Sequence, residues 1–119
     1  MTTDTASEAS SATPDEPIHV DGQAALDDAV DAHDVVLADF YADWCGPCQM
    51  LEPIVEAIAA ETDAAVAKVD VDVNQQLASA YGVRGVPTLV LFADGEQVEE
   101  LVGVQPEEQL RSIVEHYTG

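Results

Sequence analysis

Residues 44–48 read Trp44-Cys45-Gly46-Pro47-Cys48 and contain the only two cysteines of the chain. A nearly continuous apolar run, residues 35–40, comes shortly before them, and apolar residues at helical spacing follow directly after. This arrangement predicts a strand that delivers two thiols to the first turn of a helix. Such a placement is typical of a redox-active cysteine pair.

The two thiols are not expected to be equivalent. At a spacing of i, i+3 they face the same side of the helix start, and a modest adjustment closes a disulfide between them. Cys45 lies at the helix terminus, where unpaired N–H groups and the helix dipole favour its thiolate. Cys48 lies one turn further in, with less access. We therefore predict that Cys45 attacks a substrate disulfide and that Cys48 resolves the mixed disulfide.

Half of a zinc site is the alternative interpretation of two cysteines at this spacing. Zinc would need two further ligands. The chain has no other cysteine, and its three histidines lie far from the pair with no matching spacing. The sequence therefore favours redox chemistry, with no metal and no cofactor beyond the cysteine pair.

Length and composition predict one folded domain. With 119 residues, 47% of them hydrophobic, the chain can form a single packed core. Residues 1–17 are rich in Ser, Thr, Asp, Glu and Ala, so we expect a disordered acidic tail before a domain at residues 18–119. No apolar stretch has the length of a membrane span, and no basic segment followed by an apolar one begins the chain. These features predict a cytoplasmic protein without a membrane partner.

The formal net charge of −21 comes from 24 acidic residues against three basic ones. It argues against nucleic acid and anionic membranes as partners, because both are polyanions. A basic protein partner is one interpretation. A solvated surface adapted to a salt-rich cytoplasm is favoured, because the acids are spread along the whole chain. At molar salt the Debye length is about 3 Å, so the repulsion would be screened. We predict a halophilic source and loss of structure at low salt.

The remaining pattern predicts alternating strands and helices. Asp21 is a candidate N-cap for a first helix, Pro53 lies inside the helix that follows the cysteines, and Asn74 can cap a short third helix that ends at Gly82. Asp94-Gly95 predicts a hairpin turn. The expected order is β-α-β-α-β-α-β-β-α, which is an α/β layered domain. The predicted strands are residues 18–20, 35–40, 65–72, 88–92 and 98–102.

Two sequence elements together resemble the thioredoxin family. One is the pentapeptide at residues 44–48 preceded by Asp39-Phe40-Tyr41-Ala42-Asp43, and the other is Gly85-Val86-Pro87-Thr88 before an apolar strand. The resemblance runs from about Ile18 to Tyr117. It implies the thioredoxin fold, with a five-stranded mixed central sheet flanked by four helices, and the reduction of protein disulfides.

The resemblance also assigns roles by position. Cys45 corresponds to the nucleophile and Cys48 to the resolving thiol, joined as a redox-active disulfide. Asp39 corresponds to a buried carboxylate that exchanges a proton with Cys48, and Lys68, the only lysine, to its charge partner. Burial should raise the pKa of Asp39, and Lys68 would oppose that rise. The alternatives are an Asp at the strand end that reaches water and an ordinary edge lysine.

Pro87 corresponds to a cis-proline facing the disulfide. In that position it would keep metal away from the thiols and leave the Val86 backbone free to pair with an extended substrate segment. Val86 and Val104 can also be read as core residues. The resemblance implies a substrate-binding surface around Cys45 made of Trp44, Gly46, Pro47, Val86, Pro87, Gly103 and Val104.

These features together predict a general dithiol–disulfide reductase. Its partners would be disulfide-containing proteins and thioredoxin reductase or an equivalent flavin-dependent electron donor, and we expect a monomer. A thiol oxidase or isomerase of the same fold is one alternative. A non-catalytic docking module with the same surface is another.

Overall fold

Nine helices and strands follow the predicted order in the computed structural model, which describes residues 13–119. Residues 1–12 of the predicted tail lie outside the described residues. The elements are β1 (Ile18–His19), α2 (Gln23–Ala32), β2 (Val35–Tyr41), α3 (Gly46–Glu61), β3 (Ala65–Asp70), α4 (Gln75–Ala80), β4 (Thr88–Ala93), β5 (Glu96–Val102) and α5 (Glu107–Thr118).

The strands form one mixed sheet in the order β1-β3-β2-β4-β5. β1, β3 and β2 run parallel, whereas β4 is antiparallel to both β2 and β5. The central strand β2 is buried through residues 35–40, as its continuous apolar run predicts. In the register, Asp39 of β2 lies between Lys68 of β3 and Leu89 of β4.

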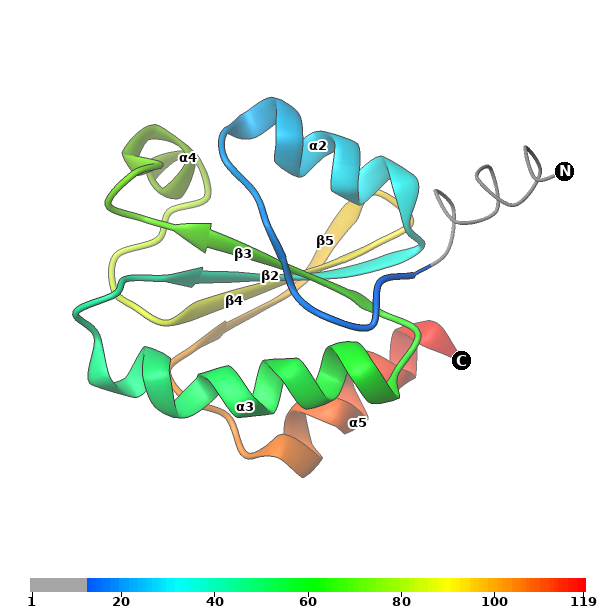
Figure 1. The fold of residues 1–119 in the computed structure, drawn as a ribbon. Helices are drawn as coiled ribbons and strands as arrows, with labels where there is room; N and C mark the ends of the chain where they lie inside the picture. The colour runs from blue at the N-terminus through cyan, green and yellow to red at the C-terminus, as the bar shows by residue number, and fades with distance from the viewer. Residues whose placement is uncertain (1–12) are drawn as a thin grey trace, which may run out of the picture.

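Helices cover both faces of the sheet, so the core has two halves. α2 and α4 lie on one face and α3 and α5 on the other (Figure 1). Alternation along β2 divides its side chains between the halves: Val36, Ala38 and Phe40 pack toward α2 and α4, while Val35 and Leu37 pack toward α3 and α5. The same alternation directs Asp39 toward the α3 side. No helix of residues 13–119 is both long and apolar enough to cross a bilayer.

Two predicted turns form as expected. Gly82, at φ 70°, follows α4, where its N–H bonds to Ser79 and the N–H of Val83 bonds to Ala78, which is the Schellman arrangement. Asp94 and Gly95 both have positive φ, of 53° and 86°, as the tight turn between β4 and β5 requires.

Of the two predicted caps, the one at α2 was wrong and the one at α4 is right in position only. Gly22, not Asp21, occupies the N-cap position of α2, and its N–H donates to Oδ1 of Asn74 at 2.7 Å. Asn74 does precede α4, but its side chain makes no cap hydrogen bond; its Nδ2 donates to the Asp70 carbonyl at 3.0 Å and to Asp21 at 3.4 Å. The asparagine thus joins two loops that are distant in the sequence.

All five strands differ from their predicted bounds, β1, β2 and β4 by one residue and β3 and β5 by two. β3 ends at Asp70, because the side chain of Asp70 accepts a hydrogen bond from the N–H of Asp72 at 2.9 Å and turns the chain there. β5 begins at Glu96, directly after the turn, and includes polar residues that carry little strand signal.

Candidate active site

The cysteine pair lies at the junction between β2 and α3. Cys45 is the N-cap residue of α3, and its Sγ accepts a hydrogen bond from the Cys48 N–H at 3.1 Å. The predicted disulfide between Cys45 and Cys48 is present, with their Cα atoms 5.2 Å apart. No acidic residue occupies the first turn of α3. The helix dipole therefore acts on the Cys45 sulfur without an opposing carboxylate in that turn.

The expected difference in access is not seen in this oxidised state. Cys45 is 3% exposed and Cys48 is 5% exposed. Bonded to each other, the two sulfurs pack into one small cluster with Ala42, against which Val86 and Tyr41 lie. Their surroundings still differ. Cys45 Sγ lies 3.7 Å from the carbonyl oxygen of Val86, whereas Cys48 lines a different hollow, beside α3.

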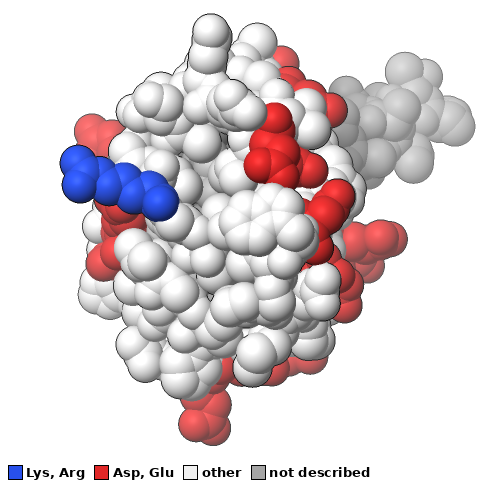
Figure 2. All heavy atoms as spheres, turned by 90° about the vertical axis from the view of Figure 1, so that its left-hand side faces the viewer, with Lys and Arg blue, Asp and Glu red and all other residues white. Residues whose placement is uncertain are grey.

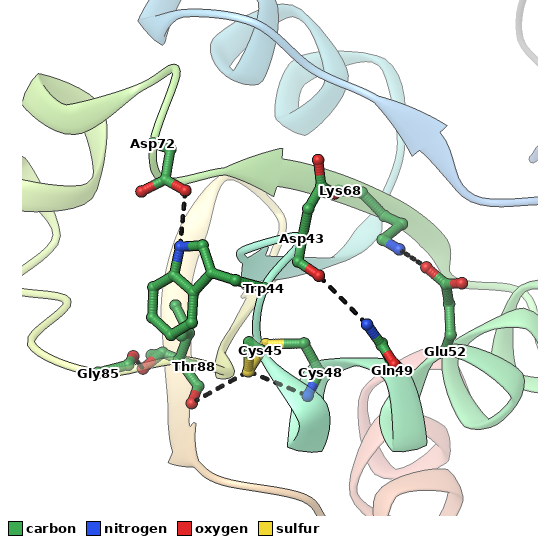
Figure 3. Close-up of a disulfide and its surroundings, with 11 residues drawn as sticks. Asp43, Trp44, Cys45, Cys48, Gln49, Glu52, Lys68, Asp72, Gly85 and Thr88 are labelled. Carbon is green, nitrogen blue, oxygen red and sulfur yellow. Dashed lines mark hydrogen bonds and ion pairs between the residues drawn. A yellow bond between two sulfur atoms is a disulfide. The ribbon is translucent and has the colours of Figure 1, made fainter.

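Around Cys45 the surface is apolar and open. Trp44 is 71% exposed, and its Nε1 donates to Asp72 at 2.8 Å (Figure 3), which fixes the indole beside the disulfide. Gly46 and Pro47 are exposed as well. Figure 2 shows this face, with an uncharged centre and acidic side chains around much of its edge. A hollow of about 200 Å³ is lined by Trp44, Val71, Ala78, Val83, Arg84, Gly85 and Val86.

The segment before β4 completes this surface. The Val86–Pro87 peptide bond is cis, as the resemblance implies, and Pro87 is buried. Gly103, at φ 90°, donates its N–H to the Pro87 carbonyl at 2.8 Å. Val104 is half-buried: it packs against the core between the sheet, α3 and α5 and keeps part of its surface in solvent. Val86 is half-buried beside the cysteines.

Asp39 is a buried carboxyl group behind the motif. It is 1% exposed, and its Oδ1 has no hydrogen-bond partner. Burial raises the pKa of Asp39 from 3.8 to about 6; Lys68 lowers this pKa and Glu52 raises it. The alternative of a carboxylate reaching water at the strand end is therefore wrong.

Lys68 does not form the direct partnership with Asp39 that its register suggests. Its side chain is 7% exposed, so it is no ordinary edge lysine, and its Nζ pairs with Oε2 of Glu52 at 2.5 Å (Figure 3). Nζ also lies 4.3 Å from the ring centroid of Tyr41. Its effect on Asp39 is the opposing charge that the sequence predicts, exerted without a hydrogen bond.

Sequence reasoning missed Glu52, Tyr41 and Asp72. Glu52 follows Cys48 by four residues, and this spacing on one helix face is the signal that could have found it. Tyr41 follows Asp39 by two residues on the same strand face. Asp72 carries no local signal, because its contact with Trp44 spans 28 residues. Within residues 13–119 no group of three or more metal-ligating side chains is gathered.

Comparisons with known proteins agree with this geometry. The thioredoxin family model matches residues 17–116. The thioredoxin of Bacillus subtilis strain 168 is 49% identical over 82 residues, covering 67% of this chain and 79% of that protein. The solved structure of a mutant thioredoxin from Halobacterium salinarum NRC-1 is 72% identical, with a TM-score of 0.89 and coverage of 91% of this chain and 96% of that one. Schistosoma mansoni thioredoxin superposes with a TM-score of 0.79 at 27% identity, covering 88% and 98% of the two chains.

Proposed function

Because this chain belongs to the thioredoxin family, it is a protein dithiol–disulfide oxidoreductase, and we propose that Cys45 opens its catalytic cycle and Cys48 closes it. The reaction uses the cysteine pair itself and needs no cofactor. One observation carries the assignment of roles: Cys45 Sγ lies at the N-terminus of α3 and beside the Val86 carbonyl, at the apolar surface.

In the first step, the Cys45 thiolate attacks one sulfur of a substrate disulfide. A bond forms between Cys45 and that sulfur, the substrate S–S bond breaks, and the other substrate sulfur leaves as a thiolate. The hydrogen bond from the Cys48 N–H and the dipole of α3 stabilise negative charge on Cys45 before the attack. Trp44 and Val86 support docking of an extended, apolar segment next to the reacting sulfur, together with Gly46, Pro47, Pro87, Gly103 and Val104.

In the second step, Cys48 resolves the mixed disulfide. Its thiol gives a proton through water to the carboxylate of Asp39, and the sulfur attacks Cys45. The Cys45–Cys48 bond forms, the bond to the substrate breaks, and the second substrate thiolate leaves. Two electrons have then passed to the substrate. A carboxyl group with a pKa near 6 supports this role, because it can accept and return a proton near neutral pH.

We further propose that the protein works in a salt-rich cytoplasm with disulfide-containing proteins as substrates and a thioredoxin reductase, or an equivalent donor, as electron source. The net charge of −21 and the 72% identity to a Halobacterium thioredoxin structure support this setting. A measured reduction potential of about −120 mV would instead favour the oxidase alternative.

The experiment is reduction of a model protein disulfide with dithiothreitol as donor, in molar KCl and in dilute buffer. We expect turnover above the dithiothreitol background in molar KCl, and none with Cys45→Ser. Turnover that survives the loss of Cys45 would refute the proposed function.

A further inference from the structure

Glu52 lies on the solvent-facing side of the site where the proton exchange between Cys48 and Asp39 is proposed. It follows Cys48 by one helical turn on α3, so both side chains face the same side of that helix. Both line a hollow of about 430 Å³, together with Tyr41, Ala42, Asp43 and Gln49. The Glu52 side chain is 50% exposed, so this residue connects the buried interior to water at the open side of the hollow.

Lys68 connects Glu52 to Asp39. The lysine is opposite Asp39 in the β2–β3 register and buried, yet its ammonium group pairs with Glu52 (Figure 3). The same ammonium group lies over the ring of Tyr41. Among the described residues, no ion pair joins Lys68 to Asp39. The Asp39 carboxyl group therefore keeps an oxygen without a partner, although a cation is anchored close by.

The elements packed around this part of β2 bring few other charges. β4 presents Leu89 in register with Asp39, and the buried side chains of α5 are Leu110 and Val114. The titratable or charged groups on the Asp39 side are Tyr41 of β2, Asp43 shortly after it, Lys68 of β3, and Cys48 and Glu52 of α3. Of these, the disulfide-bonded Cys48 does not titrate in the oxidised protein.

We propose that Glu52 is a positioning residue for proton transfer at Asp39: it holds the Lys68 ammonium group at the edge of the hollow, and so leaves the Asp39 carboxyl group free to take up and release the proton of Cys48. The inference rests on the proposed function, since that proton transfer belongs to the resolving step. It adds a residue outside the cysteine motif that sets how basic the buried carboxylate is.

The charges near Asp39 support this role. Lys68 lowers the pKa of Asp39 and Glu52 raises it, so the glutamate offsets the lysine. Without the negative charge of Glu52, the lysine would act unopposed, and the Asp39 carboxylate would become a weaker base. Proton removal from the Cys48 thiol would then slow, because the efficiency of a general base follows its pKa.

The test compares Glu52→Gln with Glu56→Gln, a control in which an exposed carboxylate one turn further along α3 is neutralised. The first readout is the titration of the Asp39 side-chain carboxyl carbon by NMR in the oxidised protein, where the cysteines cannot couple to it. We expect Glu52→Gln to lower the midpoint by about one pH unit and Glu56→Gln to leave it in place. An unchanged or raised midpoint in Glu52→Gln would overturn the proposal.

Two further measurements distinguish a failure of the proposal for Glu52 from a failure of the proposed reductase function. The same substitution in a Lys68→Met background should shift the midpoint less, because only the direct repulsion between Glu52 and Asp39 then remains; an equal shift would show that Glu52 does not act by positioning the lysine. In the reductase assay, the rate with Glu52→Gln should fall roughly two- to four-fold, with its pH profile moved in the direction of the titration. The NMR titration does not require turnover, so it tests Glu52 even if the wild-type protein reduces no substrate.

Discussion

Replacing Asp39 by Asn should remove a loss of stability that the ionisation of the buried Asp39 carboxyl group causes as pH rises. The pKa of Asp39 is raised from 3.8 to about 6 by burial, so the folded protein holds this proton more tightly than the unfolded chain does. Between these two values the folded state carries more protons, and its free energy of unfolding must fall as pH rises. The cost of the buried carboxylate is fully present only about one pH unit above the folded-state pKa.

The magnitude follows from the two pKa values. Their difference is about 2.2, and at about 1.36 kcal/mol for each pKa unit it corresponds to about 3 kcal/mol at pH 7.5. Because the unfolded chain already begins to lose this proton at pH 4, the part that develops between pH 4 and pH 7.5 is roughly 2–3 kcal/mol. Asp39→Asn removes the ionisation, so the variant should gain this amount relative to wild type over that range.

Urea unfolding of the oxidised proteins in constant molar KCl measures the effect. The cost of burying the asparagine amide does not change with pH. It therefore cancels when the difference in unfolding free energy between Asp39→Asn and wild type is compared at pH 4 and at pH 7.5. We expect the free energy of unfolding of Asp39→Asn, relative to wild type, to increase between pH 4 and pH 7.5. A difference that stays constant across this range would refute the view that Asp39 is a buried, protonatable group.

Three other predictions test the surface, the buried lysine and a turn. The melting temperature should rise between dilute buffer and molar KCl, because salt screens the repulsion within a chain of net charge −21; an unchanged value would argue against salt adaptation. Lys68→Ala should slow disulfide turnover at neutral pH without abolishing it, because loss of the lysine raises the pKa of Asp39 further and leaves more of that carboxyl group protonated and unable to accept the Cys48 proton; an unchanged rate would remove Lys68 from the mechanism. Gly82→Ala should cost about 1 kcal/mol in urea unfolding, because φ is 70° there while an added Cβ would meet no atom within 4 Å; a neutral effect would contradict the Schellman assignment.

The order of elements was predictable because its signals are local. The apolar run of β2, the helical spacing after Cys48 and the Asp94-Gly95 turn each determine a conformation within a few residues of the chain. The position of Gly82 after α4 was predictable for the same reason, since a helix end of this kind requires a residue that tolerates positive φ. These features needed no knowledge of what packs against them.

The failures came from polar side chains that bond across long distances. Asn74 looked like a helix cap, but it bonds to a loop 52 residues away, at Gly22. Nothing near either residue indicates this contact. The Asn74 Oδ1 instead accepts from the Gly22 N–H, a part-buried donor that would lose this partner if the oxygen capped α4.

The sulfur chemistry of the site was predicted from the sequence, but the arrangement of its charged side chains was predicted only in part. The pair of Cys45 and Cys48 and the burial of Asp39 could be read from the sequence. The pairing of Lys68 with Glu52 could not, because two neighbours compete for one ammonium group and only the packing of α3 on the sheet decides between them. The equal burial of the two sulfurs likewise depends on the oxidised state.

Trapping of mixed disulfides tests the central assignment of roles most directly. Cys48→Ser and Cys45→Ser proteins, both reduced, would be mixed with a disulfide-containing model protein, and the covalent adducts would be quantified by mass spectrometry. We expect Cys48→Ser to accumulate an adduct through Cys45, and Cys45→Ser to form little adduct at the same pH. Equal trapping by both variants, or trapping only through Cys48, would contradict the proposed order of attack.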